Sequence, residues 1–318
     1  LTIRERWCWI VVGRSAALLL QPMTLPLIVV AGATGQLGQT LAQLWAKSPL
    51  PQYQLKALDR TELDISEAKT VIAVLSELKP AVIVNAAAYT QVDKAESEAR
   101  VAHLVNAEAV GRIAAWSAKN SAKLIHISTD FVFDGTRQTP YRADHQTNPL
   151  GVYGESKLAG EHEIQTLASQ RTAVIRTSWL YSEYGNNFVK TMLRLMGDKD
   201  QLSVVNDQIG SPTSTHGLAA LLFAMISKDS YQGIYHWSDG ASISWYEFAQ
   251  EIQDQAIQEG LLSKAIPINP ISTSEYPTPA QRPAYSVLDR SRAVAQFECP
   301  ALDWKGQLNL VIKELARE

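Results

Sequence analysis

The stretch Leu27-Ile-Val-Val-Ala-Gly-Ala-Thr-Gly-Gln-Leu-Gly38 decides the fold predicted for this chain. It runs from a short apolar segment into three glycines that are each separated by two residues. Glycine permits a sharp turn at Gly32, close approach of a phosphate to the backbone at Gly35, and close packing of the next helix at Gly38. A helix beginning near Gln36 would direct its free N–H groups toward an anion. We therefore predict a nucleotide-binding turn, formed by Gly32, Thr34, Gly35, Gln36, Leu37 and Gly38.

Composition excludes several classes of partner. The chain has 318 residues, a formal net charge of −3 and a sequence pI of about 6.1. Because this balance predicts no basic surface, we expect neither nucleic acid nor a membrane as partner, and we favour a small molecule. Two cysteines make no disulfide framework, and the six histidines include no pair at metal-ligand spacing. These features predict a cytoplasmic globular protein without a metal site.

The first 22 residues differ from the pattern that follows. Their apolar runs are too short to span a bilayer, and Arg14 interrupts the apolar core that a signal peptide needs. Met23 stands a few residues before the first predicted strand. We interpret residues 1–22 as an extension that is disordered or absent from the natural product, with Leu1 reflecting an upstream start.

A second predicted strand, residues 54–58, ends at Asp59 and Arg60. Asp59 follows Gly38 by 21 residues, close to the position at which an acidic residue binds the adenosine ribose of NAD. The Arg60 guanidinium could instead pair with the 2′-phosphate of NADP. These two residues predict a nicotinamide cofactor, NADPH or NADH, with both accepted. A solvated strand end without a ligand is the alternative.

Strand and helix patterns alternate along the next part of the chain. Further strands are predicted at 81–85, 123–127 and 172–176, and helices at 66–78 and 96–120. Continuous apolar runs are typical of parallel strands that are covered on both faces. The alternation therefore predicts an α/β fold with a doubly wound parallel sheet of the Rossmann type. At the end of one strand, the small residues Ala86, Ala87 and Ala88 would let a cofactor lie against the backbone.

Thr129, Tyr153 and Lys157 form a candidate catalytic set. Tyr153 and Lys157 are four residues apart and would share one face of a helix. A phenol with an ordinary pKa of about 10 is a poor acid–base group at neutral pH unless a neighbouring cation stabilises the phenolate. Lys157 supplies that cation and can bind the nicotinamide ribose, while Thr129 can hydrogen-bond the substrate oxygen that Tyr153 protonates. An exposed helix turn is the alternative, and the glycine turn upstream favours catalysis.

Six stretches of the sequence resemble the dTDP-4-dehydrorhamnose reductase family, within the extended, atypical short-chain dehydrogenase/reductase superfamily. They are Asn85–Glu96, Ser128–Gly135, Pro149–Gly154, Arg176–Tyr181, Gly185–Phe188 and Asn206–Thr213. The resemblance covers essentially everything from Met23 to the C-terminus. It implies that NADPH or NADH reduces the C4 ketone of dTDP-4-dehydro-6-deoxy-L-mannose to dTDP-L-rhamnose, in nucleotide-sugar biosynthesis.

The resemblance also implies roles for individual residues. It makes Thr129, Tyr153 and Lys157 catalytic. The implied cofactor contacts are Gly35, Gln36, Leu37, Asp64, Ile65, Ala86, Ala87 and Ala88, together with Tyr153 and Lys157. The implied substrate contacts are Ser128, Thr129, Asp130, Tyr153, Trp179 and Asn187.

Magnesium and oligomerisation are points where the sequence departs from part of the family. In some members a carboxylate on the first helix helps to bind Mg²⁺ at a dimer contact. Here that region reads Gly38-Gln-Thr-Leu41, without the carboxylate. We therefore expect a monomer or a homodimer whose assembly does not depend on a metal.

The last third of the chain has a different organisation. Helices are predicted at 188–196 and 245–258, with a strand near 233–236. Five prolines between residues 267 and 283 mark a loop in which Arg282 could bind a substrate phosphate, the alternative being an ordinary surface arginine. We place the cofactor domain at 23–180, joined by parts of 210–240. Residues 181–318 would mainly form a small substrate-binding lobe, with a cleft between lobe and sheet.

Two other functions compete with the reductase. A sugar-nucleotide dehydratase of the same superfamily usually carries an Asp-Glu pair after the strand-end threonine, but here Phe131 follows Asp130. The residue that would act as the eliminating base is therefore missing. A non-catalytic regulatory subunit, like the reductase-like partner of methionine adenosyltransferase, has no chemical need for Thr129, Tyr153 and Lys157 together. Their joint presence favours an enzyme.

Overall fold

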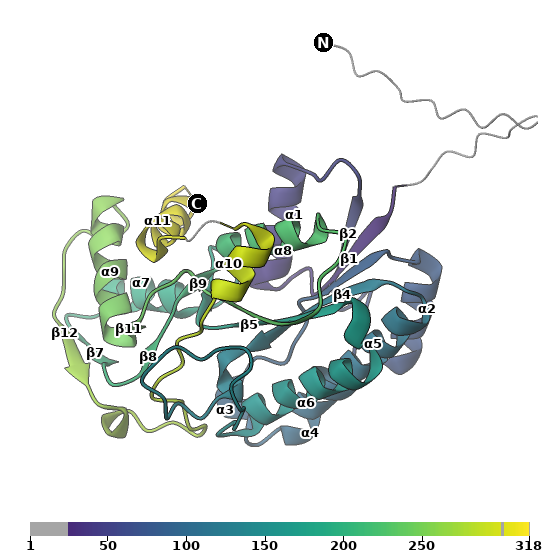
Figure 1. Cartoon of the computed structure of the whole chain (residues 1–318). Helices are drawn as coiled ribbons and strands as arrows, with labels where there is room; N and C mark the ends of the chain where they lie inside the picture. Colours follow the sequence, from purple (N-terminus) through teal and green to yellow (C-terminus); the bar gives the residue numbers. More distant parts are fainter. Residues whose placement is uncertain (1–24, 300–301, 318) are drawn as a thin grey trace, which may run out of the picture.

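A six-stranded sheet forms the centre of the computed structural model, which describes residues 25–299 and 302–317 (Figure 1). All five strand pairings are parallel, and the strand order is β10-β5-β4-β3-β1-β2. The strands are β1 (Leu27–Ala31), β2 (Gln54–Leu58), β3 (Val82–Asn85), β4 (Lys123–Thr129), β5 (Thr172–Thr177) and β10 (Gly233–Trp237). The prediction of a parallel α/β sheet is confirmed. The predicted extension, residues 1–22, lies outside the described residues.

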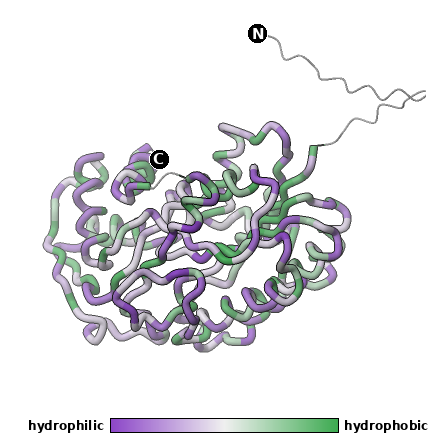
Figure 2. The backbone as a smooth tube through the Cα atoms, viewed as in Figure 1, coloured by the Kyte–Doolittle hydropathy of each residue, from purple (hydrophilic) through white to green (hydrophobic). Residues whose placement is uncertain are grey.

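Helices cover both faces of this sheet, which is why its central strands are apolar on both sides. One face packs against α1 (Gln36–Lys47), α8 (Thr215–Ile226) and α10 (Ser291–Phe297). The other packs against α2 (Ala68–Leu78), α5 (Ala109–Lys119) and α6 (Val152–Leu167). Figure 2 shows apolar backbone segments concentrated along the central strands. The doubly wound arrangement therefore follows from two separate apolar clusters, one on each side of the sheet.

The helix predicted at 96–120 differs from the observed structure. After the short helix α3 (Val92–Ala95), the segment folds as α4 (Ala99–His103), the π-helical turn η1 (Leu104–Glu108) and α5. The π turn brings the Asn106 side chain inside, where it bonds the backbone of Tyr89 and the Ser156 hydroxyl. The α6 backbone lies so close here that a Cβ on Gly160 would be 2.1 Å from the Asn106 carbonyl oxygen. A wider turn with an inward amide therefore replaces the regular helix.

A smaller lobe stands beside the sheet (Figure 1). Its core is built from α7 (Phe188–Asp198), α9 (Trp245–Gln258) and α11 (Trp304–Leu315). Short strand pairs join it: β7 (Leu202–Val205) with β12 (Ile268–Ile271), β8 (Ile209–Gly210) with β11 (Ile243–Ser244), and β6 (Leu180–Tyr181) with β9 (Thr213–Ser214). The chain passes from β5 to α7, returns for α8 and β10, leaves for α9, returns for α10 and leaves again for α11. Sheet and lobe are thus interleaved along the sequence.

The described residues contain neither a membrane-spanning helix nor a metal-binding cluster. Within 25–299 and 302–317, no helix has the length and apolar character needed to cross a bilayer. In the same residues, no three His, Cys, Asp or Glu side chains gather in a way that could hold a metal ion.

Candidate active site

The glycine turn lies where the direction of the strand order reverses, between β1 and β3. In open parallel sheets, ligands bind beyond the carboxyl ends of the strands at this reversal. Gly32 has φ +92°, and its N–H donates to the Leu58 carbonyl at 3.0 Å. A Cβ at Gly32 would lie 2.9 Å from the Ala87 backbone nitrogen, so the turn following β1 touches the segment following β3. The predicted sharp turn at Gly32 is confirmed.

The start of α1 fits a phosphate. Gly35 is the N-cap residue and contributes no side chain to cap the free N–H groups of the first turn. A Cβ on Gly38 would be 2.1 Å from the Gly32 carbonyl oxygen, which confirms that this glycine permits the close packing of helix and turn. The turn therefore has a backbone cradle and a helix dipole suited to the pyrophosphate of a dinucleotide.

The predicted adenosine-binding residues already have partners within the protein. The Asp59 carboxylate accepts hydrogen bonds from the Thr61 hydroxyl and backbone and from the Glu62 backbone, and these bonds lower its pKa. The exposed Arg60 donates to Asp64 at 3.0 Å. Ile65 is buried in the core beneath this edge. The two side chains that would distinguish NADH from NADPH therefore stand next to each other at the end of β2.

Gln36 joins the cofactor turn to the lobe. Its Oε1 accepts hydrogen bonds from the Ser182 hydroxyl and the Asn187 amide, both at 2.9 Å. Asn187 also caps α7, because its Oδ1 accepts from the Lys190 N–H at 3.1 Å. The role of Asn187 as a substrate contact stays a prediction. In the structure its side chain also links the lobe to the cofactor turn through Gln36.

Thr129 and Tyr153 come together at the end of β4. The Thr129 hydroxyl donates to the Asp130 carboxylate at 3.0 Å and lies near enough to the Tyr153 hydroxyl to lower its pKa. The Phe131 ring meets the Tyr153 ring edge-on at a centroid distance of 5.6 Å. Burial raises the pKa of Asp130 to about 6. The structure therefore places two of the predicted catalytic residues, and one predicted substrate contact, around a single point.

The protonation of Tyr153 differs from the sequence-based expectation. Burial raises the pKa of Tyr153 to about 12, and the Thr129 hydrogen bond only partly offsets this rise. The sequence predicts that Lys157 lowers the Tyr153 pKa, but the Lys157 ammonium donates instead to the Ile127 carbonyl at 2.6 Å. It also lies 3.4 Å from His126 Nε2, and burial lowers the pKa of Lys157 to about 8. Tyr153 consequently keeps its proton at neutral pH, as a proton donor must.

His126 is a buried, hydrogen-bonded residue. Its Nδ1 lies 3.1 Å from the Asn85 amide nitrogen, and burial lowers its pKa well below the usual value. The neutral ring therefore lies between Asn85, at the end of β3, and Lys157.

Two residues that sequence reasoning did not single out fix the catalytic helix. The Glu96 carboxylate accepts from the Val152 N–H at 2.9 Å and so caps α6 from a neighbouring segment. A Cβ at Gly154 would be 2.3 Å from the Phe131 carbonyl oxygen, so α6 approaches the 3₁₀ turn η2 (Asp130–Val132) very closely. The sequence could have pointed to Gly154, because it follows Tyr153 in a family-like stretch. Nothing in the sequence indicates that Glu96 caps α6.

A buried ion pair lies beneath the same helix. Arg176 of β5 donates to both carboxylate oxygens of Glu161, with its closest contact at 2.6 Å. Ser128, predicted as a substrate contact, donates its hydroxyl to the same carboxylate. The guanidinium also covers the Phe133 ring at 5.1 Å. This pair ties α6, which carries Tyr153 and Lys157, to the ends of β4 and β5.

Two predicted substrate contacts remain, Trp179 and Arg282. Trp179 follows β5 and is partly exposed. Arg282 forms a two-pronged ion pair with Asp93, at 3.0 and 2.8 Å. Its phosphate-binding role stays a prediction, and a phosphate would have to compete with the Asp93 carboxylate for the guanidinium.

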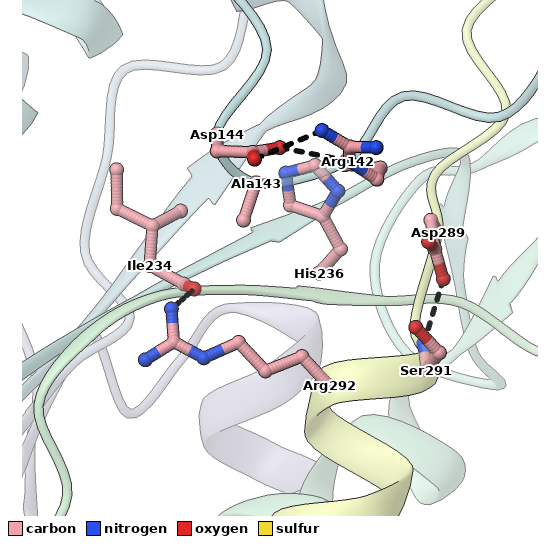
Figure 3. Close-up of a pocket in the computed structure, with 8 residues that line it drawn as sticks. All are labelled: Arg142, Ala143, Asp144, Ile234, His236, Asp289, Ser291 and Arg292. Atoms are coloured by element: carbon pink, nitrogen blue, oxygen red, sulfur yellow. Dashed lines mark hydrogen bonds and ion pairs between the residues drawn. The ribbon is translucent and has the colours of Figure 1, made fainter.

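Two surface cavities lie apart from these residues. One, of about 450 Å³, opens between the Arg142–Asp144 loop, β10 and the start of α10, where Arg292 points at the Ile234 carbonyl (Figure 3). A second, of about 480 Å³, shares Arg142 and Asp289 with it. Neither is lined by the glycine turn or by Tyr153. We place the candidate active site at the strand ends because the predicted catalytic residues and the glycine turn both lie at this edge of the parallel sheet.

Several known proteins that are similar to this chain over most of its length carry the same name. A protein of Aggregatibacter actinomycetemcomitans named dTDP-4-dehydrorhamnose reductase is 42% identical over 286 residues, covering 88% of this chain and 96% of that protein. One of the same name from Escherichia coli K12 is 37% identical, covering 91% and 97%. A crystal structure of dTDP-4-dehydrorhamnose reductase from Bacillus anthracis, in complex with NADP, superposes with a TM-score of 0.84 at 37% identity, covering 92% of this chain and all of that one.

More distant structures share the architecture alone. A UDP-glucose 4-epimerase of Thermus thermophilus, in complex with NAD, has a TM-score of 0.74 at 16% identity.

The family model described as the RmlD substrate binding domain matches residues 26–317, nearly the whole described chain. Together with the full-length relatives, this match shows that the chain belongs to the RmlD family, that of the dTDP-4-dehydrorhamnose reductases.

Proposed function

We propose that this chain is a nicotinamide-dependent oxidoreductase that reduces the C4 ketone of dTDP-4-dehydrorhamnose to give dTDP-L-rhamnose. The observation that carries the proposal is the proximity of Thr129 and Tyr153 at the end of β4, with Lys157 on the same helix and the glycine turn at the same edge of the parallel sheet. Membership of the family supports the same reaction. Asp130, Trp179, Asn187 and Arg282 are the proposed contacts of the nucleotide-sugar.

The cofactor fits the turn that the chain provides. The backbone from Gly32 to Gly38 would hold the pyrophosphate, and the backbone from Ala86 to Ala88 would lie against the nicotinamide half. Lys157 would bind the nicotinamide ribose. When bound, the reduced nicotinamide supplies the hydride for the substrate carbon.

The chain's own residues handle the proton. Tyr153, with its pKa raised to about 12, holds a proton that it gives to the C4 oxygen as negative charge develops there. The Thr129 hydroxyl accepts from the Phe131 N–H and gives its one hydrogen to Asp130. It would turn that hydrogen from Asp130 to the C4 oxygen and so supply a second hydrogen bond there. Lys157, whose pKa is about 8, is mostly charged at neutral pH and adds positive potential near the developing oxyanion.

The direct test is oxidation of NADPH or NADH in the presence of dTDP-4-dehydrorhamnose. We expect cofactor oxidation that depends on the 4-keto sugar and yields dTDP-L-rhamnose. Absence of sugar-dependent oxidation with both cofactors, in protein that is folded, would contradict the proposal.

Cofactor choice is expected to depend on Arg60. Asp59 repels a 2′-phosphate and Arg60 attracts it, so we propose that both cofactors work. Replacing Arg60 with alanine should raise the dissociation constant of NADPH more than that of NADH, measured by fluorescence titration. Lys56→Ala, on the same strand, serves as the control. Equal losses for the two cofactors would show that Arg60 does not contact the phosphate.

Substitutions at two glycines of the turn, Gly35 and Gly38, should distinguish an effect on cofactor binding from an effect on stability. Gly35 has an ordinary φ of −73°, and a Cβ there would approach only the Gly32 carbonyl, at 3.3 Å. Gly35→Val should therefore leave a folded protein that no longer binds the cofactor. Gly38→Val should also lower the thermal midpoint, because its Cβ would overlap the backbone. A Gly35→Val protein with unchanged cofactor affinity would exclude this site.

A further inference from the structure

Trp179 has an unusual backbone for a large side chain. Its φ is +48°, in the left-handed region that side chains with a Cβ rarely adopt. The residue stands just past β5, and its carbonyl accepts from the Thr213 N–H at 3.2 Å. A conformation of this kind persists only where surrounding groups hold it. The structure must therefore contain the groups that keep Trp179 in place.

Trp245 is the first of these groups. The two indole rings stack face to face, with centroids 3.5 Å apart and planes 12° apart. Trp245 opens α9, whose start is fixed by a complete capping box between Ser244 and Glu247. Phe188 of α7 packs against the Trp245 ring at 4.6 Å. Trp245 thus lies in the lobe, whereas the backbone of Trp179 directly follows β5 of the sheet.

Gly210 is the second group. A Cβ at this position would lie 2.5 to 2.8 Å from three atoms of the Trp179 indole. Any other residue would therefore push the ring away from its present place. The backbone of β8 and the face of Trp245 together define one position for the Trp179 side chain.

We propose that Trp245 is a positioning residue for substrate: its ring holds Trp179 in the orientation that receives the nucleotide-sugar. The inference rests on the proposed function, because it takes Trp179 to be a substrate contact. A preorganised aromatic surface loses no side-chain entropy when a planar base or a sugar face packs on it. Removing Trp245 should therefore weaken substrate binding and leave the hydride-transfer step and the cofactor site unchanged.

The test combines a spectrum with kinetics. Stacked indoles couple their transitions, so wild-type protein should give a paired positive and negative band in the circular dichroism of its tryptophans. Trp245→Leu and Trp179→Phe should each abolish that pair of bands. Trp116→Phe serves as the control, because Trp116 lies on α5 and bonds Ser76 on α2, in the other apolar cluster.

Trp245→Leu should raise the KM for dTDP-4-dehydrorhamnose by roughly three- to tenfold, the size expected for loss of an aromatic pair. Its kcat and its KM for NADPH should stay within about twofold of wild type, and Trp245→Phe should recover part of the KM. The proposal is overturned if the coupled bands disappear while the substrate KM stays at the wild-type value. It is also overturned if cofactor KM, kcat and substrate KM all change together, because that pattern indicates general damage to the lobe.

Titration with dTDP-L-rhamnose separates this inference from the proposed reaction. A wild-type protein that binds this product but never reduces the 4-keto sugar would refute the reaction. In that case we still expect Trp245→Leu to bind dTDP-L-rhamnose more weakly than Trp116→Phe does. Equal affinities of the two variants for dTDP-L-rhamnose would overturn the positioning role, whatever the reaction.

Discussion

Replacing Tyr153 with phenylalanine is expected to reduce turnover about 10²- to 10⁴-fold, the range typical of a lost general acid. The hydroxyl is the proposed source of the proton, and its pKa of about 12 keeps it protonated at working pH. The phenylalanine ring would preserve the edge-on contact with Phe131, so substrate KM should change little. Steady-state kinetics with the 4-keto sugar measures both quantities.

A matched control is available on the surface of the lobe. Tyr246 lies on α9, where its hydroxyl accepts from the Gln250 amide, and Tyr246→Phe should retain wild-type kinetics. Wild-type turnover in Tyr153→Phe would mean that another group delivers the proton. A large rise in KM at unchanged kcat would mean that Tyr153 binds substrate without donating a proton.

The second large effect is expected on stability. Arg176→Met leaves the Glu161 carboxylate buried without its cation, with Ser128 as a remaining donor. Breaking a buried ion pair in this way typically costs about 3–5 kcal/mol. In a protein of this size such a loss corresponds to a fall of roughly 10 °C in the thermal midpoint. Calorimetry of the variant measures the fall.

Two further variants define the cause. Arg142→Met breaks the exposed pair with Asp144 and should change the midpoint little, because surface pairs contribute little. The double variant Glu161→Leu, Arg176→Met should be more stable than Arg176→Met alone, since no unpaired charge stays buried. If the single and double variants melt together well below wild type, packing rather than charge explains the loss.

The sequence was sufficient for features that are encoded locally. The apolar run ending at Ala31 and the glycine spacing after it depend on neighbours within a dozen residues, and both the turn and the close packing at Gly38 were predicted correctly. The alternation of strands and helices likewise predicted the parallel sheet. The position of the Lys157 ammonium, in contrast, could not be predicted from local sequence. Its distance from Tyr153 in sequence indicated a shared face, but the ammonium also had access to the Ile127 carbonyl, which only the folded strand end provides.

Other features depend on residues far apart in the chain. The π turn at Leu104–Glu108 interrupts a pattern that reads as one helix, because Asn106 reaches Tyr89 and Ser156. The cap that Glu96 places on α6 joins residues 56 positions apart. Residue type alone does not predict such pairings, because a glutamate that caps a distant helix cannot be distinguished in the sequence from one that is exposed to solvent. Trp179 and Trp245 meet for a similar reason, across the boundary between sheet and lobe.

The interleaving of sheet and lobe has a consequence for how the chain folds. β5 ends at Thr177, but its outer partner β10 begins only at Gly233, and the pairing joins residues 60 positions apart, as with Arg176 and His236. Contacts at such separation form late, because the intervening loop must close first. A ribosome-bound chain that has just completed β5 would expose that edge, together with the apolar face that α8 later covers. Synthesis must reach the final third before the first part gains its edge strand, so sheet and lobe should fold in one cooperative step.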